Sequence, residues 1–172
     1  MTKDLIRAGV TVLLAALSAG CVTEAAFVPS GKHASEYLVR HAAGVLLDGV
    51  DYTRWSGQEV AGWCWRDQAT GRLGRVEQAH LGSDEGVGLE LPLDPARSRN
   101  LACSWHTHPW GSHVAPGPSR RDLANSNLPW VRDIPHFLLD QYGLWHYARG
   151  RIVTMCPWMS DGSGFAMDRC RA

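Results

Sequence analysis

Two histidines, His106 and His108, stand one residue apart in the segment "LACSWHTH" (101–108). The apolar start of this segment predicts a buried strand. Because residues two apart point to the same face of a strand, we expect the two imidazoles to project together, with Thr107 on the opposite face. Two imidazoles in this relation can occupy two corners of a tetrahedral zinc site. Histidines also occur on strands as ordinary core or surface residues, so the pair alone is a weak signal.

Asp122 is the natural candidate for a third ligand. The stretch 109–118 holds three prolines and two glycines in ten positions, which argues against regular structure there. Ser119 then opens a predicted helix with Asp122 in its first turn, a pattern that is also a variant of the helix capping box. Three protein ligands leave the fourth zinc position to water, as in catalytic zinc sites. Zinc lowers the pKa of such a water to about 7 and so supplies hydroxide at neutral pH.

A zinc hydrolase also needs a base for the proton of the water and a donor for the developing oxyanion. Glu59 begins "EVAGWCWRD" (59–67), which is rich in aromatic and β-branched residues and predicts a strand that could lie beside the histidine strand. The hydroxyl of Ser119 could point at the same cavity. Three other glutamates compete for the role of base in poorer sequence contexts: Glu77, Glu85 and Glu90.

These residues together resemble the JAMM motif of the JAB/MPN+ metallopeptidases, which is a glutamate, a later H-x-H-P and a later S-x-x-D. The resemblance covers residues 33–155 and implies a JAB/MPN-like fold and a zinc-dependent hydrolase of amide or isopeptide bonds. It implies that Glu59 activates water and that Ser119 steadies the tetrahedral intermediate. The zinc ligands that it implies are His106, His108 and Asp122.

The chain departs from the family pattern between His108 and Ser119. The ten residues "PWGSHVAPGP" are a few more than the family usually has there. An insertion in a loop costs little free energy, but it can reshape the cleft. It also adds His113, for which we favour a solvated loop position over a role as a metal or substrate ligand.

Two other functions compete with a zinc peptidase. The first is a structural zinc module with a closed Cys₂His₂ set, and its ligands would be Cys64, Cys103, His106 and His108. The second is a non-catalytic binding lipoprotein that keeps the fold and holds a partner in an aromatic groove, given the eight tryptophans. Nucleic-acid binding is not expected, because 17 basic and 17 acidic residues leave no net charge.

The first twenty residues predict an export signal, with Lys3 and Arg7 before an apolar run that is too short to span a bilayer. "LSAGC" resembles the lipobox of bacterial lipoproteins, with Ser18 where leucine is usual. This resemblance implies lipidation of Cys21, a membrane anchor and, because Val22 follows, the outer membrane facing the periplasm. The alternative is an ordinary signal peptide and a free Cys21 thiol. A peptide, an isopeptide or a peptidoglycan stem peptide would be the substrate in that compartment.

Four further cysteines predict two disulfides in an oxidising compartment. Three pairings are possible and the sequence does not choose among them. We favour Cys64–Cys103 between strands and Cys156–Cys170 closing the tail.

A helix, several strands, another helix and further strands predict an α/β or α+β domain, a mixed central sheet flanked by helices in three layers. We expect a signal peptide over 1–20, a tether over 21–31 and one domain over 32–172, which is long enough to bury a core. Residues 33–48 have helical apolar spacing, and 49–58 follow as a connector. Residues 75–82 predict a partner for the strand at 59–67. The segment 136–156 predicts two strands around its turns, as in a meander.

Overall fold

The computed structural model describes residues 32–70, 72–82, 100–111 and 114–172. The predicted signal peptide, the tether and Cys21 lie outside these residues. Glu85, Glu90 and His113 also lie outside them, so their predicted roles are not placed in the structure.

Within these residues, six strands form one mixed sheet in the order β2-β1-β3-β4-β5-β6. Only β3 and β4 run parallel, while the other neighbouring pairs are antiparallel. The strands are β1 (Val60–Arg66), β2 (Leu73–Leu81), β3 (Leu101–Thr107), β4 (His136–Asp140), β5 (Gly143–Ala148) and β6 (Arg151–Pro157). The expected strand at 59–67, its partner and the histidine strand are therefore confirmed within a residue or two at their ends.

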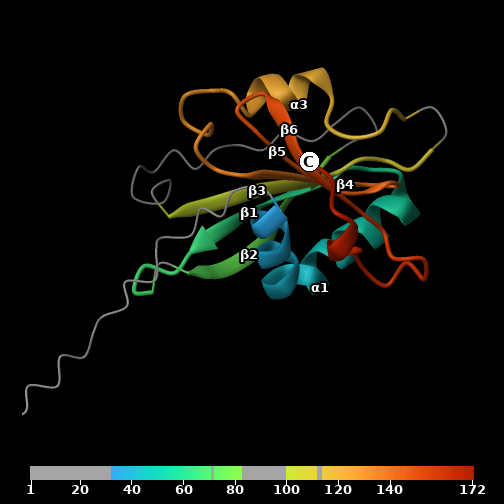
Figure 1. The fold of residues 1–172 in the computed structure, drawn as a ribbon, viewed down its shortest axis with the longest axis horizontal. Helices are drawn as coiled ribbons and strands as arrows, with labels where there is room; N and C mark the ends of the chain where they lie inside the picture. Colours follow the sequence, from blue (N-terminus) through green and yellow to red (C-terminus); the bar gives the residue numbers. More distant parts are fainter. Residues whose placement is uncertain (1–31, 71, 83–99, 112–113) are drawn as a thin grey trace, which may run out of the picture.

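Helices lie on both faces of this sheet (Figure 1). The long helix α1 (Lys32–Ser56) covers one face, and the short 3₁₀ helix η1 (Met167–Arg169) lies on the same side. The opposite face carries α3 (Arg120–Asn125). This arrangement confirms the expected mixed sheet flanked by helices in three layers. We call the two sides of the sheet the α1 face and the α3 face.

Helix α1 is longer than predicted, because residues 49–56 continue it where a connector was expected. The apolar stripe explains the extension. Leu46, Val50 and Thr53 follow one another at helical spacing and are each no more than 1% exposed. Gly57 then ends the helix in the left-handed region with φ +72°, and its N–H donates to the Thr53 carbonyl at 2.9 Å.

Two glycines make room for Trp105, the largest fully buried side chain. A Cβ on Gly49 of α1 would lie 2.9 Å from the Trp105 ring, and a Cβ on Gly62 of β1 would lie 2.6 Å from its indole nitrogen. The Trp105 indole N–H donates to the Glu77 carbonyl at 3.2 Å, and Gly62 lies beside both groups. The missing side chain of Gly49 lets α1 approach β3 closely, and that of Gly62 leaves room for the indole between β1 and β3.

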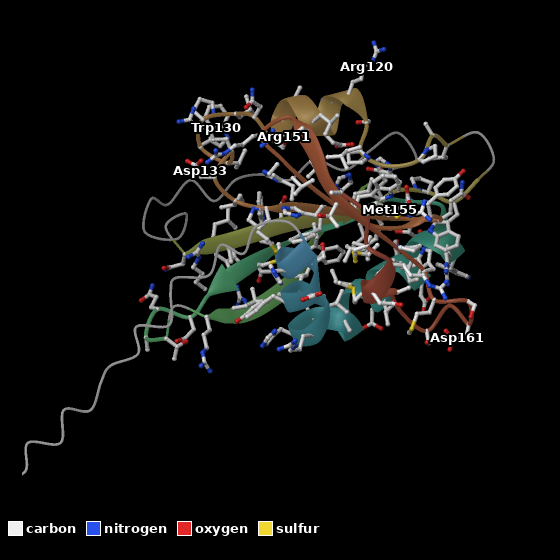
Figure 2. All side chains as sticks on the ribbon, in the orientation of Figure 1. Arg120, Trp130, Asp133, Arg151, Met155 and Asp161 are labelled. Carbon is white, nitrogen blue, oxygen red and sulfur yellow. A yellow bond between two sulfur atoms is a disulfide. The ribbon has the colours of Figure 1, made fainter. Side chains whose placement is uncertain are left out.

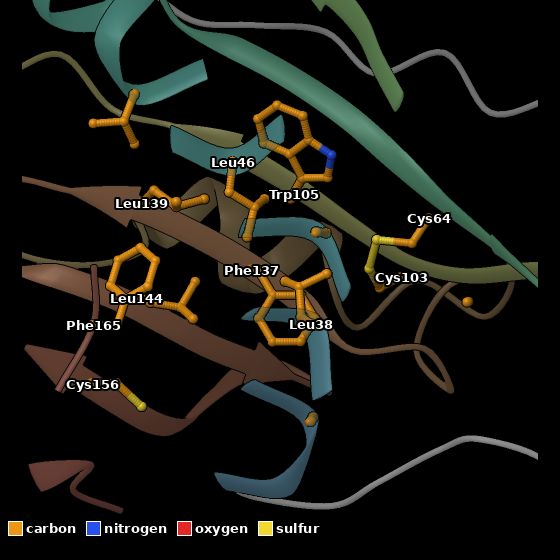
Figure 3. Packing of buried hydrophobic residues seen from close by; sticks show 14 of the residues in the cluster. Leu38, Leu46, Cys64, Cys103, Trp105, Phe137, Leu139, Leu144, Cys156 and Phe165 are labelled. Atoms are coloured by element: carbon orange, nitrogen blue, oxygen red, sulfur yellow. A yellow bond between two sulfur atoms is a disulfide. The ribbon is translucent and has the colours of Figure 1, made fainter. Parts of the chain in front are cut away.

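The core lies between α1 and the sheet, where residues of the helix, of the strands and of the C-terminal tail pack together. Figure 3 shows members of this cluster: Leu38, Leu46, Cys64, Cys103, Trp105, Phe137, Leu139, Leu144, Cys156 and Phe165. The strands alternate, so that in β4 Phe137 and Leu139 enter this core while His136 and Asp140 face the other side.

The segment 136–156 forms three strands where two were predicted. The meander itself is confirmed, since β4, β5 and β6 are neighbours in sequence and in the sheet. The second turn explains the extra strand. Arg149 and Gly150 both have positive φ, 51° and 76°, and connect the paired residues Ala148 and Arg151. Two residues of that conformation make the tight turn that matches the twist of a hairpin.

Both favoured disulfides are present, Cys64–Cys103 between β1 and β3 and Cys156–Cys170 between β6 and the C-terminal tail. They indicate an oxidising compartment outside the cytoplasm. Among the described residues, no helix has the length and apolar character needed to cross a membrane.

Candidate metal centre

His106 and His108 project from the α3 face, as their spacing predicts. Thr107 between them points the other way, where its hydroxyl meets that of Thr53 on α1 at 2.5 Å. His108 follows the last residue of β3 and stays in register because its N–H donates to the Leu139 carbonyl at 3.0 Å. Both histidines are no more than 9% exposed, so the imidazoles stand in a sheltered position.

Asp122 meets these two imidazoles although it lies in a different element. The two Nε2 atoms of His106 and His108 are 3.2 Å apart. Asp122 Oδ1 lies 3.5 Å from His106 Nε2, and Asp122 Oδ2 lies 3.4 Å from His108 Nε2. A tetrahedral zinc ion with bonds of about 2.0–2.2 Å holds its ligand atoms about 3.3–3.6 Å apart. Each histidine nitrogen thus lies near a different oxygen of Asp122, and the three side chains have donor types and separations that suit one shared metal ion.

The capping box at the start of α3 orients the Asp122 carboxylate. Ser119 is the N-cap, and its hydroxyl accepts from the Asp122 N–H at 3.2 Å. The Ser119 N–H and hydroxyl both donate to Asp122 Oδ2, at 2.8 and 2.6 Å. Arg120, the first residue of α3, extends away from the sheet (Figure 2). The predicted cap is thus confirmed, and the same bonds hold the carboxylate towards the histidines.

Glu59 is the glutamate that the structure brings to this cluster. It directly precedes β1, the neighbour of β3, and its Oε1 lies 3.9 Å from His108 Nε2. Its side chain is 13% exposed, so it is sheltered but still reachable by water. Glu77 lies on β2, where the Trp65 indole donates to it at 2.5 Å and Arg75 pairs with it at 2.6 Å. Of the glutamates in the described residues that were considered for the base, only Glu59 stands beside the histidines.

The Thr107 hydroxyl sets the start of β1 and therefore the position of Glu59. It accepts the Val60 N–H at 2.9 Å and lies 3.3 Å from the Val60 carbonyl oxygen. The backbone pairing of β1 with β3 ends at Ala61 and His106, so this hydroxyl replaces the next backbone contact. Glu59 is the residue before Val60, and the contact keeps it at the histidine end of the strands.

The charges of the cluster favour an ionised carboxylate. Burial by itself would raise the pKa of Asp122, but hydrogen bonds from His106 and His108 lower it well below its usual range. Burial would lower the pKa of His108, but the hydrogen bond to Asp122 and the charge of Glu59 raise it above its usual value. A proton on His108 and a metal cation therefore compete for the same negatively charged position.

A row of polar residues beneath the histidines was not predicted. Ser104, His136 and Tyr147 are cross-strand neighbours on β3, β4 and β5. Ser104 Oγ lies 2.7 Å from His136 Nδ1, and His136 Nε2 donates to the Val131 carbonyl at 3.1 Å, so Nδ1 accepts from the hydroxyl. Burial lowers the pKa of His136 to about 4 and keeps it neutral. The period-two pattern of these strands indicated that such residues share a face, but only the pairing register shows which residues meet.

Tyr147 connects this row to the metal ligands. Its hydroxyl lies 3.5 Å from His106 Nδ1, the ring nitrogen that faces away from His108 and Asp122. Partners of this kind fix the tautomer and the ring orientation of metal-binding histidines. The tyrosine is 4% exposed and its pKa is raised by burial, so it stays a neutral hydroxyl.

The structure contradicts the closed Cys₂His₂ module. Cys64 and Cys103 are bonded to each other and enter the core on the α1 face, whereas His106 and His108 project from the α3 face. Among the residues that the structure describes, no thiolate therefore joins the cluster.

Three tryptophans do not form the aromatic groove that the competing binding function would need. Trp110 and Trp158 pack against the core on the α1 face, where the Arg54 guanidinium lies 3.8 Å from the centre of the Trp110 ring. Trp105 is fully buried on the same side. These three rings contribute to packing rather than to a surface beside the histidines.

In comparisons with known proteins, neither a family model nor a curated protein matches the chain. The chemistry of the cluster therefore follows from its own side chains. Three residues of the described chain form a group able to hold a metal ion, with ligand atoms within 4.8 Å of one another: His106, His108 and Asp122.

Proposed function

We propose that this protein is a zinc-dependent hydrolase of amide or isopeptide bonds with a JAB/MPN-like fold. The observation that carries the proposal is the convergence of two imidazole nitrogens and one carboxylate, with nearest atoms 3.2–3.5 Å apart and Glu59 Oε1 at 3.9 Å from His108 Nε2. The motif residues that resemble those of the JAB/MPN+ metallopeptidases come from three separate segments, and they converge in this arrangement.

Each residue has a defined part in such a reaction. When bound, zinc polarises the substrate carbonyl and activates water for attack. Glu59 takes a proton from the attacking water and passes it to the leaving nitrogen as the C–N bond breaks. Ser119 donates a hydrogen bond to the oxyanion by turning its single hydroxyl proton away from Asp122 Oδ2, which keeps the bond from the Ser119 N–H.

The oxidising compartment limits the classes of substrate that such an enzyme would meet. Two disulfides indicate an oxidising environment, and the N-terminal sequence resembles a bacterial lipoprotein signal. We propose an envelope protein anchored by lipid on Cys21, on the periplasmic side of the outer membrane, that acts on a peptide, an isopeptide or a peptidoglycan stem peptide. Incorporation of labelled fatty acid by the wild type and its loss in Cys21→Ala test the anchor.

The hydrolase is tested by zinc analysis and by cleavage of a library of linear, isopeptide-linked and stem peptides. We expect about one equivalent of zinc and cleavage by the wild type. Glu59→Gln should keep the zinc and lose about 10²–10⁴-fold in rate, because a general base contributes that much. Glu77→Gln is the matched control and should cleave like the wild type, since Glu77 is occupied by Trp65 and Arg75.

Two outcomes would contradict this function. Absence of zinc binding would contradict zinc-dependent hydrolysis. A protein that binds zinc but cleaves no member of the library, with or without Glu59, would favour a non-catalytic binding lipoprotein of the same fold.

A further inference from the structure

The turn that connects β4 to β5 binds the long loop 109–118 at two points. Asp140, the last residue of β4, accepts the Gly117 N–H with Oδ2 at 2.8 Å. Gln141 accepts the Gly111 N–H at 3.2 Å and donates to the Gly111 carbonyl at 3.0 Å. The loop is thus attached near both of its ends to a part of the sheet that contains no metal ligand.

Asp140 itself is held rigidly. Its other oxygen, Oδ1, accepts the N–H groups of Tyr142 and Gly143 at 2.8 and 3.1 Å. The side chain is 1% exposed, and the Asp140 carbonyl accepts the Trp158 indole N–H at 2.8 Å. Three backbone donors converge on one buried carboxylate, and hydrogen bonds to an ionised acceptor are the stronger kind. The carboxylate therefore cannot turn away from Gly117 without giving up the bonds of its own turn.

Gly117 lies only two residues before the cap that orients Asp122. Its φ of +78° is a conformation that favours glycine, and a Cβ there would lie 3.2 Å from the Trp145 ring. Pro118 has a fixed φ, and Ser119 follows as the N-cap that bonds to Asp122. A short and stiff chain therefore joins the Asp140 carboxylate to the third ligand.

We propose that Asp140 is a positioning residue, which with Gln141 sets the distance between the Asp122 carboxylate and the two histidines. The ten residues 109–118 join His108 to Ser119, the N-cap of α3, so these attachments restrict where the cap and Asp122 lie relative to the histidines. Attachment at Gly111 fixes the histidine end and attachment at Gly117 fixes the Asp122 end. This inference rests on the proposed zinc site and deepens it by naming what preorganises it.

The test is the zinc affinity of Asp140→Asn, measured by competition with a chromophoric chelator. The amide has the size of the carboxylate, but its NH₂ group cannot accept a backbone N–H, so one of the attachments is lost. We expect zinc to bind about 10–100-fold more weakly, the usual cost of losing a partner that orients a ligand. Asp161→Asn is the matched control, because exposed Asp161 accepts from Ser163 in a distant loop and should leave the affinity unchanged.

A double variant separates positioning from general loosening of the protein. In an Asp122→Ala background, Asp140→Asn should have no further effect on zinc affinity, because its effect passes through Asp122. An equal loss in both backgrounds would overturn the proposal. The visible spectrum of bound Co²⁺ gives an independent readout, and it should change in Asp140→Asn as the carboxylate leaves the ion.

The remaining outcomes are also decisive. Wild-type zinc affinity and an unchanged Co²⁺ spectrum in Asp140→Asn would overturn the positioning role and leave the hydrolase intact, whereas absence of zinc binding by the wild type would remove both. If Asp140→Asn does not fold, Gln141→Ala decides, because Gln141 is only half-buried and its loss frees the Gly111 end of the loop. We expect about a tenfold loss of zinc affinity there, and no loss would overturn the proposal.

Discussion

The two faces of the sheet are built from the same strands but have opposite chemistry. Trp105 and His106 are neighbours on β3, yet Trp105 is fully buried under α1 while His106 stands in a polar cluster on the α3 face. On the α1 face a helix of 25 residues supplies apolar cover. On the α3 face the helix has six residues and buries none of its own side chains fully.

The comparison shows two ways to bury a strand residue. Apolar groups on the α1 face need only cover, and their removal from water stabilises the fold. Polar groups on the α3 face must find partners, since a buried polar group without one costs free energy. His136 has such partners in Ser104 and the Val131 carbonyl, and Asp140 has three N–H donors. Stability is therefore concentrated on one face and chemistry on the other.

The largest effect is expected from Trp105→Ala on the α1 face. Removing this ring leaves a cavity under α1 and should lower the free energy of unfolding by about 3–5 kcal/mol. Trp55→Ala is the control, because Trp55 is 85% exposed and should change stability by no more than about 0.5 kcal/mol. Denaturant unfolding measures both. Equal losses in the two variants would contradict the placement of the core.

Acid should destabilise the metal-free protein through the α3 face. His136 has a pKa of about 4 when folded and about 6.5 when unfolded, so the unfolded chain binds the proton first. Its contribution is complete above pH 6.5 and is lost as the pH falls to 4, by up to about 3 kcal/mol. Unfolding of wild type and His136→Gln across this range, with a chelator present, isolates the effect. Parallel pH profiles would show that His136 is not buried as a neutral group.

Zinc should stabilise the protein through the α3 face alone. At a free concentration 100 times its Kd, a ligand of the folded state adds about 2.7 kcal/mol to the free energy of unfolding. A chelator should reverse the gain, and Asp122→Ala should show little of it at the same zinc concentration. The same gain in both proteins would place the zinc elsewhere.

The smallest pair of effects concerns two glycines of α1. Gly49→Ala places a methyl group against the Trp105 ring and should destabilise by about 1 kcal/mol, after the gain in helix propensity is included. Gly44→Ala meets nothing within 4 Å and should stabilise by about 0.5–1 kcal/mol. Thermal unfolding of both variants would show opposite shifts in Tm. Stabilisation in both would mean that α1 does not approach β3 as described.

Local patterns in the sequence were sufficient for the parts of the site that lie within one element. The spacing of His106 and His108 determines that they share a face, because a strand alternates with period two. Ser119 and Asp122 form the cap that their separation predicts, because an N-cap bonds to the third residue of its helix. The helix was predicted too short, because Gly49 interrupts its local pattern. The reason for a glycine at this position is its contact with the Trp105 ring, which only the packed structure shows.

Only the tertiary structure decided what meets across elements. It chose Glu59 over Glu77, joined Cys64 to Cys103 and showed that Asp122 faces the histidines. The period-two pattern did not show that Ser104, His136 and Tyr147 meet as a row, and nothing local indicated that loop 109–118 is attached to Asp140. The physical reason is the sequence distance over which each feature is determined. The direction of a side chain follows from a few nearby backbone angles, whereas contact between distant segments depends on the pairing register and packing of the whole sheet.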